Sequence, residues 1–154
     1  MTAQWGYTAP AWLPGGNLQT IVAAKLSRRY QGVPPRRQRE RWHTPDQDFI
    51  DVDWLQTNAV AQQDKTQPLL VLFHGLEGSS QSHYAQAFAG TAERLGWAMA
   101  LPHFRGCSGE MNWAPRAYHS GDYEEIGWML AQFKQRHAGP IYAVGVSLGG
   151  NALM

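Results

Sequence analysis

The sequence predicts an α/β fold in which an antiparallel hairpin precedes parallel strands joined by crossover helices. From residue 69 onward, strand-length apolar runs alternate with helix-length segments of period 3.6, a pattern typical of a parallel sheet. The run Leu69–Phe73 has five consecutive apolar residues, as expected for a strand buried on both faces. With 44% hydrophobic and 16% charged residues among 154, the composition favours a folded core over a disordered chain.

The first 35 residues are expected to form an irregular N-terminal extension, because prolines and glycines recur through them. Within this extension, residues 18–29 could form a short helix. Residues 36–154 are expected to form the folded domain. It opens with a hairpin of strands Arg36–Thr44 and Phe49–Thr57 around a turn at 45–48. Residues 58–67 form a polar connector.

Alternation in the second hairpin strand predicts two faces. Residues Ile50, Val52, Trp54 and Gln56 are expected on one face, and Phe49, Asp51, Asp53 and Leu55 on the other.

Three strands and two helices are expected after the hairpin. Ser82 can cap the first helix, which Gly96 ends, and its buried stripe is expected to hold Ala85, Phe88, Ala92 and Leu95. The strand Trp97–Leu101 follows. Asp122 and Glu125 resemble a capping pair at the start of the second helix, which Gly139 and Pro140 stop before the strand Ile141–Gly145. The stripe of that helix is expected to hold Ile126, Met129, Leu130, Phe133 and His137.

Basic residues are concentrated near the start of the chain, although the formal net charge is only +1. Seven of the 13 Lys and Arg residues lie between positions 25 and 41. This segment could bind nucleic acid or anionic lipid. A solvated face beside an edge strand, where charge discourages aggregation, is the favoured interpretation. No nucleic-acid-binding motif accompanies the arginines, so no nucleic acid partner is expected.

Several other features limit the function classes. The single cysteine, Cys107, excludes an internal disulfide, and the histidines have no metal-ligand spacing, so no metal or other cofactor is expected. No apolar run is long enough to span a membrane, and the first residues do not resemble a secretory signal. A cytoplasmic protein is therefore the expectation. The sequence does not indicate an oligomeric state.

The strongest chemical motif is Gly-Val-Ser-Leu-Gly at residues 145–149, directly after an apolar strand and before helix-compatible residues. This context is typical of a nucleophile elbow, in which a sharp turn exposes a serine at the carboxyl end of a sheet. Side chains at Gly145 and Gly149 would collide with the neighbouring strand and helix. Ser147 is the candidate nucleophile. A glycine-rich turn beside a phosphate is the alternative, but the lysine of a P-loop is absent.

A second motif, Phe-His-Gly-Leu-Glu-Gly-Ser at residues 73–79, follows the first parallel strand. In hydrolases with a nucleophile elbow, one oxyanion donor is the amide after the nucleophile, and the other comes from such a loop. The candidate donors are the amides of Leu148 and Leu76. Gly75 would let the backbone approach the site closely. His74 is interpreted as a structural histidine that ties the loop down.

A third motif, His-Phe-Arg-Gly-Cys-Ser-Gly-Glu at residues 103–110, follows the next strand. Its two glycines and its arginine suggest a tight loop that a guanidinium contact holds in place. For Arg105, a scaffolding role is favoured over substrate binding. Cys107 is interpreted as a packing residue, because Ser147 has the better setting for a nucleophile.

The sequence resembles a group of α/β-hydrolases, because its motifs have similar residues and occur in the same order along the chain. Two further motifs belong to this resemblance, Tyr-His-Ser-Gly at 118–121 and Asn-Leu-Gln-Thr at 17–20. The group includes the bacterial YheT-type hydrolases, eukaryotic medium-chain esterases, and acylglycerol and phospholipid lipases. The resemblance implies the α/β-hydrolase fold and serine esterase chemistry on a small-molecule ester. It assigns the nucleophile to Ser147 and the oxyanion donors to Leu76 and Leu148.

The sequence departs from this group in length. The triad order in this fold is serine, acid, histidine, and only seven residues follow Ser147. Residues 36–154 are therefore expected to be the N-terminal portion of a hydrolase domain, catalytically incomplete, with its last strand at the edge of the sheet. Acyl transfer or thioester hydrolysis on the same fold remains an alternative. So does a non-catalytic fragment that binds through residues 25–41.

Overall fold

A computed structural model describes residues 8–25, 33–56 and 65–154. The chain divides into two compact units, residues 1–32 and 33–154, and each is described by itself. In the first unit, helix α1 (Gly16–Lys25) begins two residues earlier than expected. The later part of the expected helix, residues 26–29, lies outside the described residues, as does most of the expected connector at 58–67.

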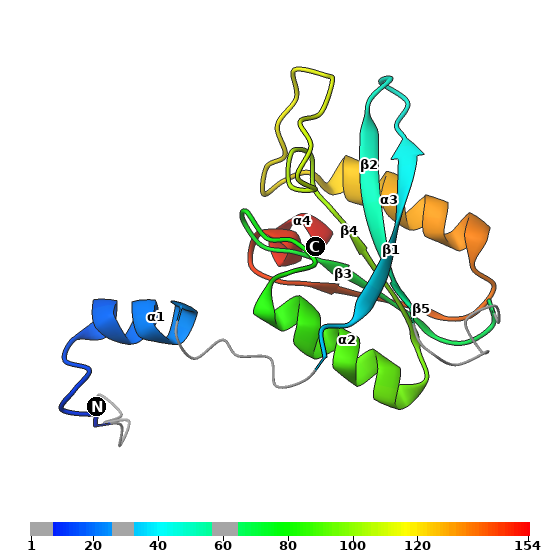
Figure 1. Cartoon of the computed structure of the whole chain (residues 1–154). Coiled ribbons are helices and arrows are strands. Elements are labelled where there is room, and N and C mark those ends of the chain that lie inside the picture. Colours follow the sequence, from blue (N-terminus) through cyan, green and yellow to red (C-terminus); the bar gives the residue numbers. More distant parts are fainter. Residues whose placement is uncertain (1–7, 26–32, 57–64) are drawn as a thin grey trace, which may run out of the picture. The chain divides into compact units, whose positions relative to one another are not determined.

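The second unit is built on a mixed five-stranded sheet in the order β1-β2-β4-β3-β5 (Figure 1). Strands β1 (Arg36–His43) and β2 (Phe49–Gln56) form the expected antiparallel hairpin. β2 also pairs antiparallel with β4 (Ala98–Pro102). β3 (Leu69–Phe73) lies between β4 and β5 (Ile141–Gly145) and is parallel to both. The predicted hairpin and parallel strands are confirmed, and within the described residues β5 pairs only with β3.

Helices pack against both faces of the sheet (Figure 1). Side chains of α3 (Tyr123–Arg136) and α4 (Leu148–Leu153) join one core cluster, and those of α2 (His83–Leu95) join the other. β3 contributes Leu69, Val71 and Phe73 to the first cluster, and Leu70 and Leu72 to the second. Burial on both faces explains why β3 is apolar at every position.

The two predicted faces of β2 are confirmed. Ile50 and Val52 lie in the α3 cluster, and Leu55 lies in the α2 cluster. Asp51 and Asp53 are also buried, which alternation alone does not explain. Their carboxylates form ion pairs with arginines of β1, so charge compensation permits their burial.

The prediction for α2 is partly wrong. Ser82 occupies the N-cap position, but its side chain makes no capping bond. Its hydroxyl instead accepts the Ser79 N–H at 3.1 Å, in the preceding turn. Leu95 is 59% exposed, and Ala89 takes its expected place among the buried residues. The helix ends as predicted at Gly96, which adopts φ 67°.

The capping prediction for α3 is wrong. Asp122 lies at the N-cap but makes no capping bond; its carboxylate pairs with Arg116. Glu125 pairs with Arg105, 20 residues away in the chain. Ion pairs with Arg116, six residues earlier, and with Arg105 therefore take both carboxylates from the local cap. The predicted stripe is otherwise confirmed by burial of Ile126, Met129 and Phe133 with Leu130 packed beside them, while His137 lies just past the helix.

Candidate active site

Ser147 lies in the sharp turn between β5 and α4. Its backbone adopts φ 52° and ψ −115°, in a region that costs a serine roughly 1–3 kcal/mol. The preceding amide, Val146 N–H, donates to Phe73 O at 3.0 Å and keeps the chain aligned with β3 up to the turn. Asn151 N–H donates to Ser147 O at 3.0 Å, and this bond starts the helix. The turn exposes Ser147 at the carboxyl end of the parallel strands.

Glycines surround this turn because the backbone segments lie too close for side chains. A Cβ atom on Gly145 would collide with the backbone of Gly150 in α4. A Cβ atom on Gly149 would lie 2.5 Å from the carbonyl oxygens of Phe73 and His74. The collisions expected from the sequence are therefore present, one with the helix and one with the end of β3.

The loop after β3, residues 75–79 (the 75–79 loop), lies directly beside Ser147. A Cβ atom on Gly75 would be 3.3 Å from Val146 O and 3.4 Å from Ser147 Cβ. Leu76 follows Gly75, and its side chain is 69% exposed. Leu148 is the first residue of α4, where amide groups have no intrahelical acceptor. The structure thus brings the loop that carries the Leu76 amide against the turn that carries the Leu148 amide.

His74 is completely buried and uses both ring nitrogens. Its Nε2 accepts the Phe104 N–H at 3.0 Å, so the proton is on Nδ1, which donates to Gly75 O at 2.7 Å. Burial lowers the pKa of His74 to about 4, so the ring is neutral at pH 7. His74 therefore links the loops after β3 and β4 and has no nitrogen available to accept a proton from Ser147.

The buried Arg105 side chain forms ion pairs with the buried carboxylates of Asp48 and Glu125 and with the exposed carboxylate of Asp46 (together the Arg105 cluster). Its Nη1 lies 2.7 Å from Asp48 Oδ2 and 2.9 Å from Asp46 Oδ2, and its Nε lies 2.7 Å from Glu125 Oε1. The hydrogen bond from Arg105 lowers the pKa of Asp46 to about 2. These contacts join the hairpin turn, the loop after β4 and α3, so Arg105 holds the scaffold together.

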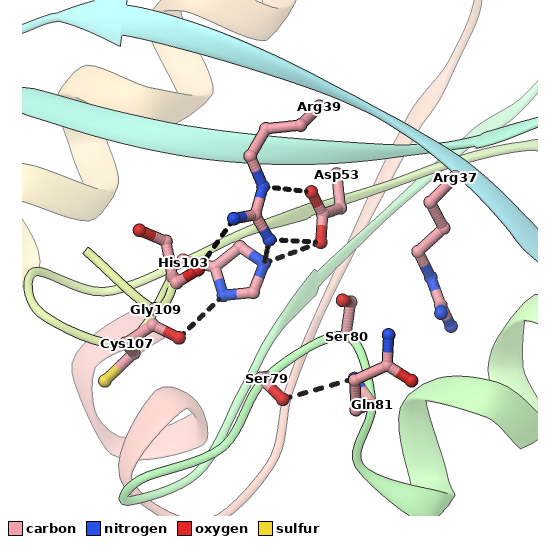
Figure 2. A pocket seen from close by; sticks show the side chains of 10 residues that line it. Arg37, Arg39, Asp53, Ser79, Ser80, Gln81, His103, Cys107 and Gly109 are labelled. Atoms are coloured by element: carbon pink, nitrogen blue, oxygen red, sulfur yellow. Dashed lines mark hydrogen bonds and ion pairs between the residues drawn. The ribbon is translucent and has the colours of Figure 1, made fainter.

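A second charged group, around the buried carboxylate of Asp53, lies beside a pocket of about 440 Å³ (Figure 2). Arg39 binds both carboxylate oxygens of Asp53, at 2.7 and 3.0 Å, and His103 Nε2 lies 2.8 Å from Asp53 Oδ2. Burial alone would raise the pKa of Asp53, but hydrogen bonds from His103 and Arg39 hold it well below its usual range. Ser147 is not among the residues that line this pocket.

The sequence did not predict the Asp53 group, since its partners lie 14 and 50 residues away from it. The one signal in the sequence was the presence of two aspartates between Phe49 and Leu55 on one face of β2. Cys107 also lines the pocket and is half-buried. Burial raises the pKa of its thiol, so Cys107 is poorly suited to act as a nucleophile.

Metal ligands and membrane spans are absent from the part of the chain that the structure describes. Across residues 8–25, 33–56 and 65–154, no three His, Cys, Asp or Glu side chains are placed to hold a metal ion. No helix in the same ranges has the length and apolarity needed to cross a bilayer.

Comparisons with known proteins identify relatives that are longer than this chain. The chain is 44% identical over 139 residues to the Escherichia coli protein named putative esterase YheT, covering 89% of this chain and 39% of that protein. It is 30% identical over 151 residues to mouse phospholipase ABHD3, covering 96% of this chain and 36% of that protein. The chain therefore spans less than half the length of these relatives. No family model matches.

Solved structures share the fold at low sequence identity. The Pyrococcus furiosus esterase Pf2001 matches with a TM-score of 0.54 and 15% identity, over 80% of this chain and 48% of that chain. Mouse alpha/beta hydrolase domain-containing protein 10 matches with a TM-score of 0.53 and 17% identity, over 73% of this chain and 41% of that chain. The similarity shows that this chain adopts part of the α/β-hydrolase fold.

Proposed function

We propose that this chain, a homologue of α/β-hydrolases that carries part of their fold, supplies the nucleophile and the oxyanion hole of a serine-dependent ester hydrolase. The observation that carries the proposal is the backbone of Ser147, strained and exposed between β5 and α4. The close approach of Gly75 to the same serine supports it further. Strain at an exposed nucleophilic side chain is typical of a functional position.

In the proposed reaction, the Ser147 hydroxyl attacks the ester carbonyl and loses its proton to a histidine. The amides of Leu76 and Leu148 stabilise the negative charge that forms on the carbonyl oxygen. The alkoxide leaves with the proton from that histidine, and an acyl group stays bound to Ser147. Water then attacks the acyl-enzyme, releases the carboxylic acid and restores the serine.

We propose that the triad histidine and acid of the natural protein lie in the region that corresponds to the part of the relatives not covered by this chain. His74 and His103 have both ring nitrogens in hydrogen bonds, so neither is placed to serve as the base. Residues 1–154 alone are therefore expected to have little or no turnover, because the triad supplies most of the rate enhancement.

The proposed substrate is a small-molecule carboxylic ester with a short or medium acyl chain, or an acylglycerol. The names of the relatives, an esterase and a phospholipase, support an ester substrate. Acyl transfer and thioester hydrolysis would use the same acyl-enzyme. Adding an alcohol to the assay separates hydrolysis from transfer, because a transferase would form a new ester in place of the acid.

Binding of an anionic partner through residues 25–41 is less well supported. Arg39 and Arg41, two of the seven basic residues, pair with Asp53 and Asp51 of the neighbouring strand. These arginines therefore hold the hairpin together, and their charge is largely compensated inside the fold.

The test is hydrolysis of a p-nitrophenyl butyrate ester by the natural protein that contains this chain. Replacement of Ser147 by alanine is expected to abolish hydrolysis, whereas replacement of Ser120, an exposed serine of the segment before α3, is expected to leave it unchanged. Unchanged hydrolysis by Ser147→Ala would refute the proposed nucleophile. Hydrolysis by residues 1–154 alone that depends on Ser147 would refute the assignment of the base to another part of the protein.

A further inference from the structure

Two tyrosine hydroxyls hold the backbone of the 75–79 loop, one on each side of Leu76. Tyr84 Oη accepts the Gly75 N–H at 3.1 Å. Tyr118 Oη accepts the Glu77 N–H at 2.9 Å. Tyr84 comes from α2, and Tyr118 comes from the segment between β4 and α3, so two separate elements reach the same loop. Both amides that flank the Leu76 amide are therefore fixed by side chains from elsewhere in the chain.

Tyr118 is itself held in one orientation. Its ring stacks on the ring of Phe104, with centroids 5.3 Å apart and an interplanar angle of 6°. Its hydroxyl donates to Glu77 Oε1 at 3.0 Å while it accepts the Glu77 amide. Burial raises the pKa of Tyr118 to about 12, so the hydroxyl keeps its proton at neutral pH. The Tyr118 hydroxyl therefore both donates a hydrogen bond to Glu77 and accepts one from it.

The Tyr84 hydroxyl occupies a space in the loop that is open only because residue 78 is glycine. A Cβ atom on Gly78 would collide with Tyr84 Oη. The loop closes over this position through a hydrogen bond from Gly78 N–H to Gly75 O at 2.9 Å. The hydroxyl of Tyr84 therefore lies inside the turn, next to the residue whose backbone approaches Ser147.

The loop needs such anchors because its conformation is unfavourable for its sequence. Glu77 adopts φ 51°, in the left-handed region where residues with a side chain are uncommon. Glu77 and its neighbour Leu76 are exposed, so packing does little to hold them. Hydrogen bonds to the two tyrosines offset this cost, together with the bonds that Gly75 O accepts from His74 and Gly78.

We propose that Tyr84 and Tyr118 are positioning residues that fix the Leu76 amide in the direction of the developing oxyanion. The inference rests on the proposed function, because it takes Leu76 as an oxyanion donor. Neither tyrosine needs to touch the substrate. Their effect is on the geometry of a donor, and a misdirected donor stabilises the transition state less while binding the substrate ester about equally well.

The first test concerns the anchors and does not depend on catalysis. Amide hydrogen exchange is measured by NMR on the natural protein that contains this chain, with Tyr84→Phe, Tyr118→Phe or the control Tyr123→Phe, a residue that is 68% exposed. Exchange is expected to accelerate at least tenfold at Gly75 in the first variant and at Glu77 in the second. Amides of β3 are expected to stay protected in all three. Unchanged exchange at both loop amides would overturn the inference.

The second test measures ester hydrolysis by the natural protein that contains this chain. Each anchor variant is expected to lower kcat about tenfold with KM within twofold, and Tyr123→Phe is expected to change neither. The expected loss is smaller than the roughly 100- to 1,000-fold loss on removing an oxyanion donor, because the Leu76 amide is still present. A variant that raises KM and leaves kcat unchanged would contradict a positioning role.

The two hypotheses fail in different ways. If Ser147→Ala abolishes hydrolysis but the double variant Tyr84→Phe/Tyr118→Phe keeps kcat within twofold, the inference is wrong and the proposed function stands. If Ser147→Ala has no effect, the proposed nucleophile is wrong, and a positioning role toward its oxyanion falls with it. Hydrogen exchange would then still report whether the two hydroxyls anchor the loop.

Discussion

In the mixed sheet, different kinds of contact hold the two sides of β3, the side of β4 and the side of β5. Beside β4, ion pairs to the buried groups Arg105, Glu125 and Asp53 form the Arg105 cluster and the Asp53 group. Beside β5, the elbow at residues 145–149 relies on close backbone approach and on glycines. The first arrangement joins the hairpin turn and the loop after β4 to each other and to α3. The second leaves Ser147 exposed, as the proposed role of nucleophile requires, at the cost of local strain.

The largest effect is expected from Arg105→Met, which tests how far the β4 side depends on charge. The substitution keeps an unbranched side chain but leaves Asp48 and Glu125 buried without their cation. The free energy of unfolding is expected to fall by about 3–5 kcal/mol. Urea unfolding followed by tryptophan fluorescence measures this. The matched control Arg94→Met, on the exposed part of α2, is expected to change it by less than about 0.5 kcal/mol. Equal effects of the two would contradict the role given to the Arg105 cluster.

A smaller loss is expected from Gly149→Ala, which tests the β5 side. The added methyl group would lie 2.5 Å from two backbone carbonyl oxygens, so β3 and α4 must move apart. Overpacking of this kind costs about 1–3 kcal/mol. Gly127→Ala is the control, because its Cβ atom would meet nothing within 4 Å in the middle of α3. It is expected to stabilise by up to about 1 kcal/mol. If both variants shifted stability in the same direction, the close approach of β3 to residue 149 would not be what requires glycine there.

His74 lies between the two sides and makes stability depend on pH. Its ring is neutral in the fold, with a pKa of about 4, whereas the unfolded chain binds a proton near pH 6.5. Unfolding therefore takes up a proton below pH 6.5, so the stabilisation is complete above that pH and is lost as pH falls toward 4. Between pH 7 and 4.5 the free energy of unfolding is expected to fall by roughly 2–3 kcal/mol.

The comparison for this prediction is His74→Asn, which removes the titrating ring. Its unfolding free energy is expected to be lower at pH 7 but flatter between pH 7 and 4.5. A wild-type profile that stays flat over the same range would show that burial of the neutral ring does not govern the pH dependence.

The smallest change in the free energy of unfolding is expected for the exposed ion pair between Glu110 and Arg41. Glu110 pairs with Arg41, but its side chain is 63% exposed, and Arg41 is also held by Asp51. Glu110→Gln is expected to cost no more than about 1 kcal/mol and to matter less at high salt. Chemical unfolding at low and high salt measures this. A loss comparable to that of Arg105→Met would mean that exposure does not weaken these pairs.

The two sides also differ in how far the sequence predicts them. The turn between β5 and α4 could be predicted directly, because strand, turn and helix are adjacent in the chain and glycine is required at fixed positions. The Arg105 cluster could not, because Asp48 and Glu125 lie 57 and 20 residues from the arginine. The same separation explains why the local sequence suggests a capping role for Glu125, whose partner in the structure is Arg105. The anchors Tyr84 and Tyr118 were missed because a tyrosine hydroxyl carries no local pattern, although Gly78 marked the space beside one of them.

The most direct test of the account is covalent labelling of the natural protein with a fluorophosphonate, followed by mass spectrometry of its peptides. A phosphonyl adduct on Ser147 is predicted, with no adduct after Ser147→Ala and none on Cys107. An ester hydrolase that remains unlabelled at Ser147, or that carries its adduct on another residue, would contradict the account.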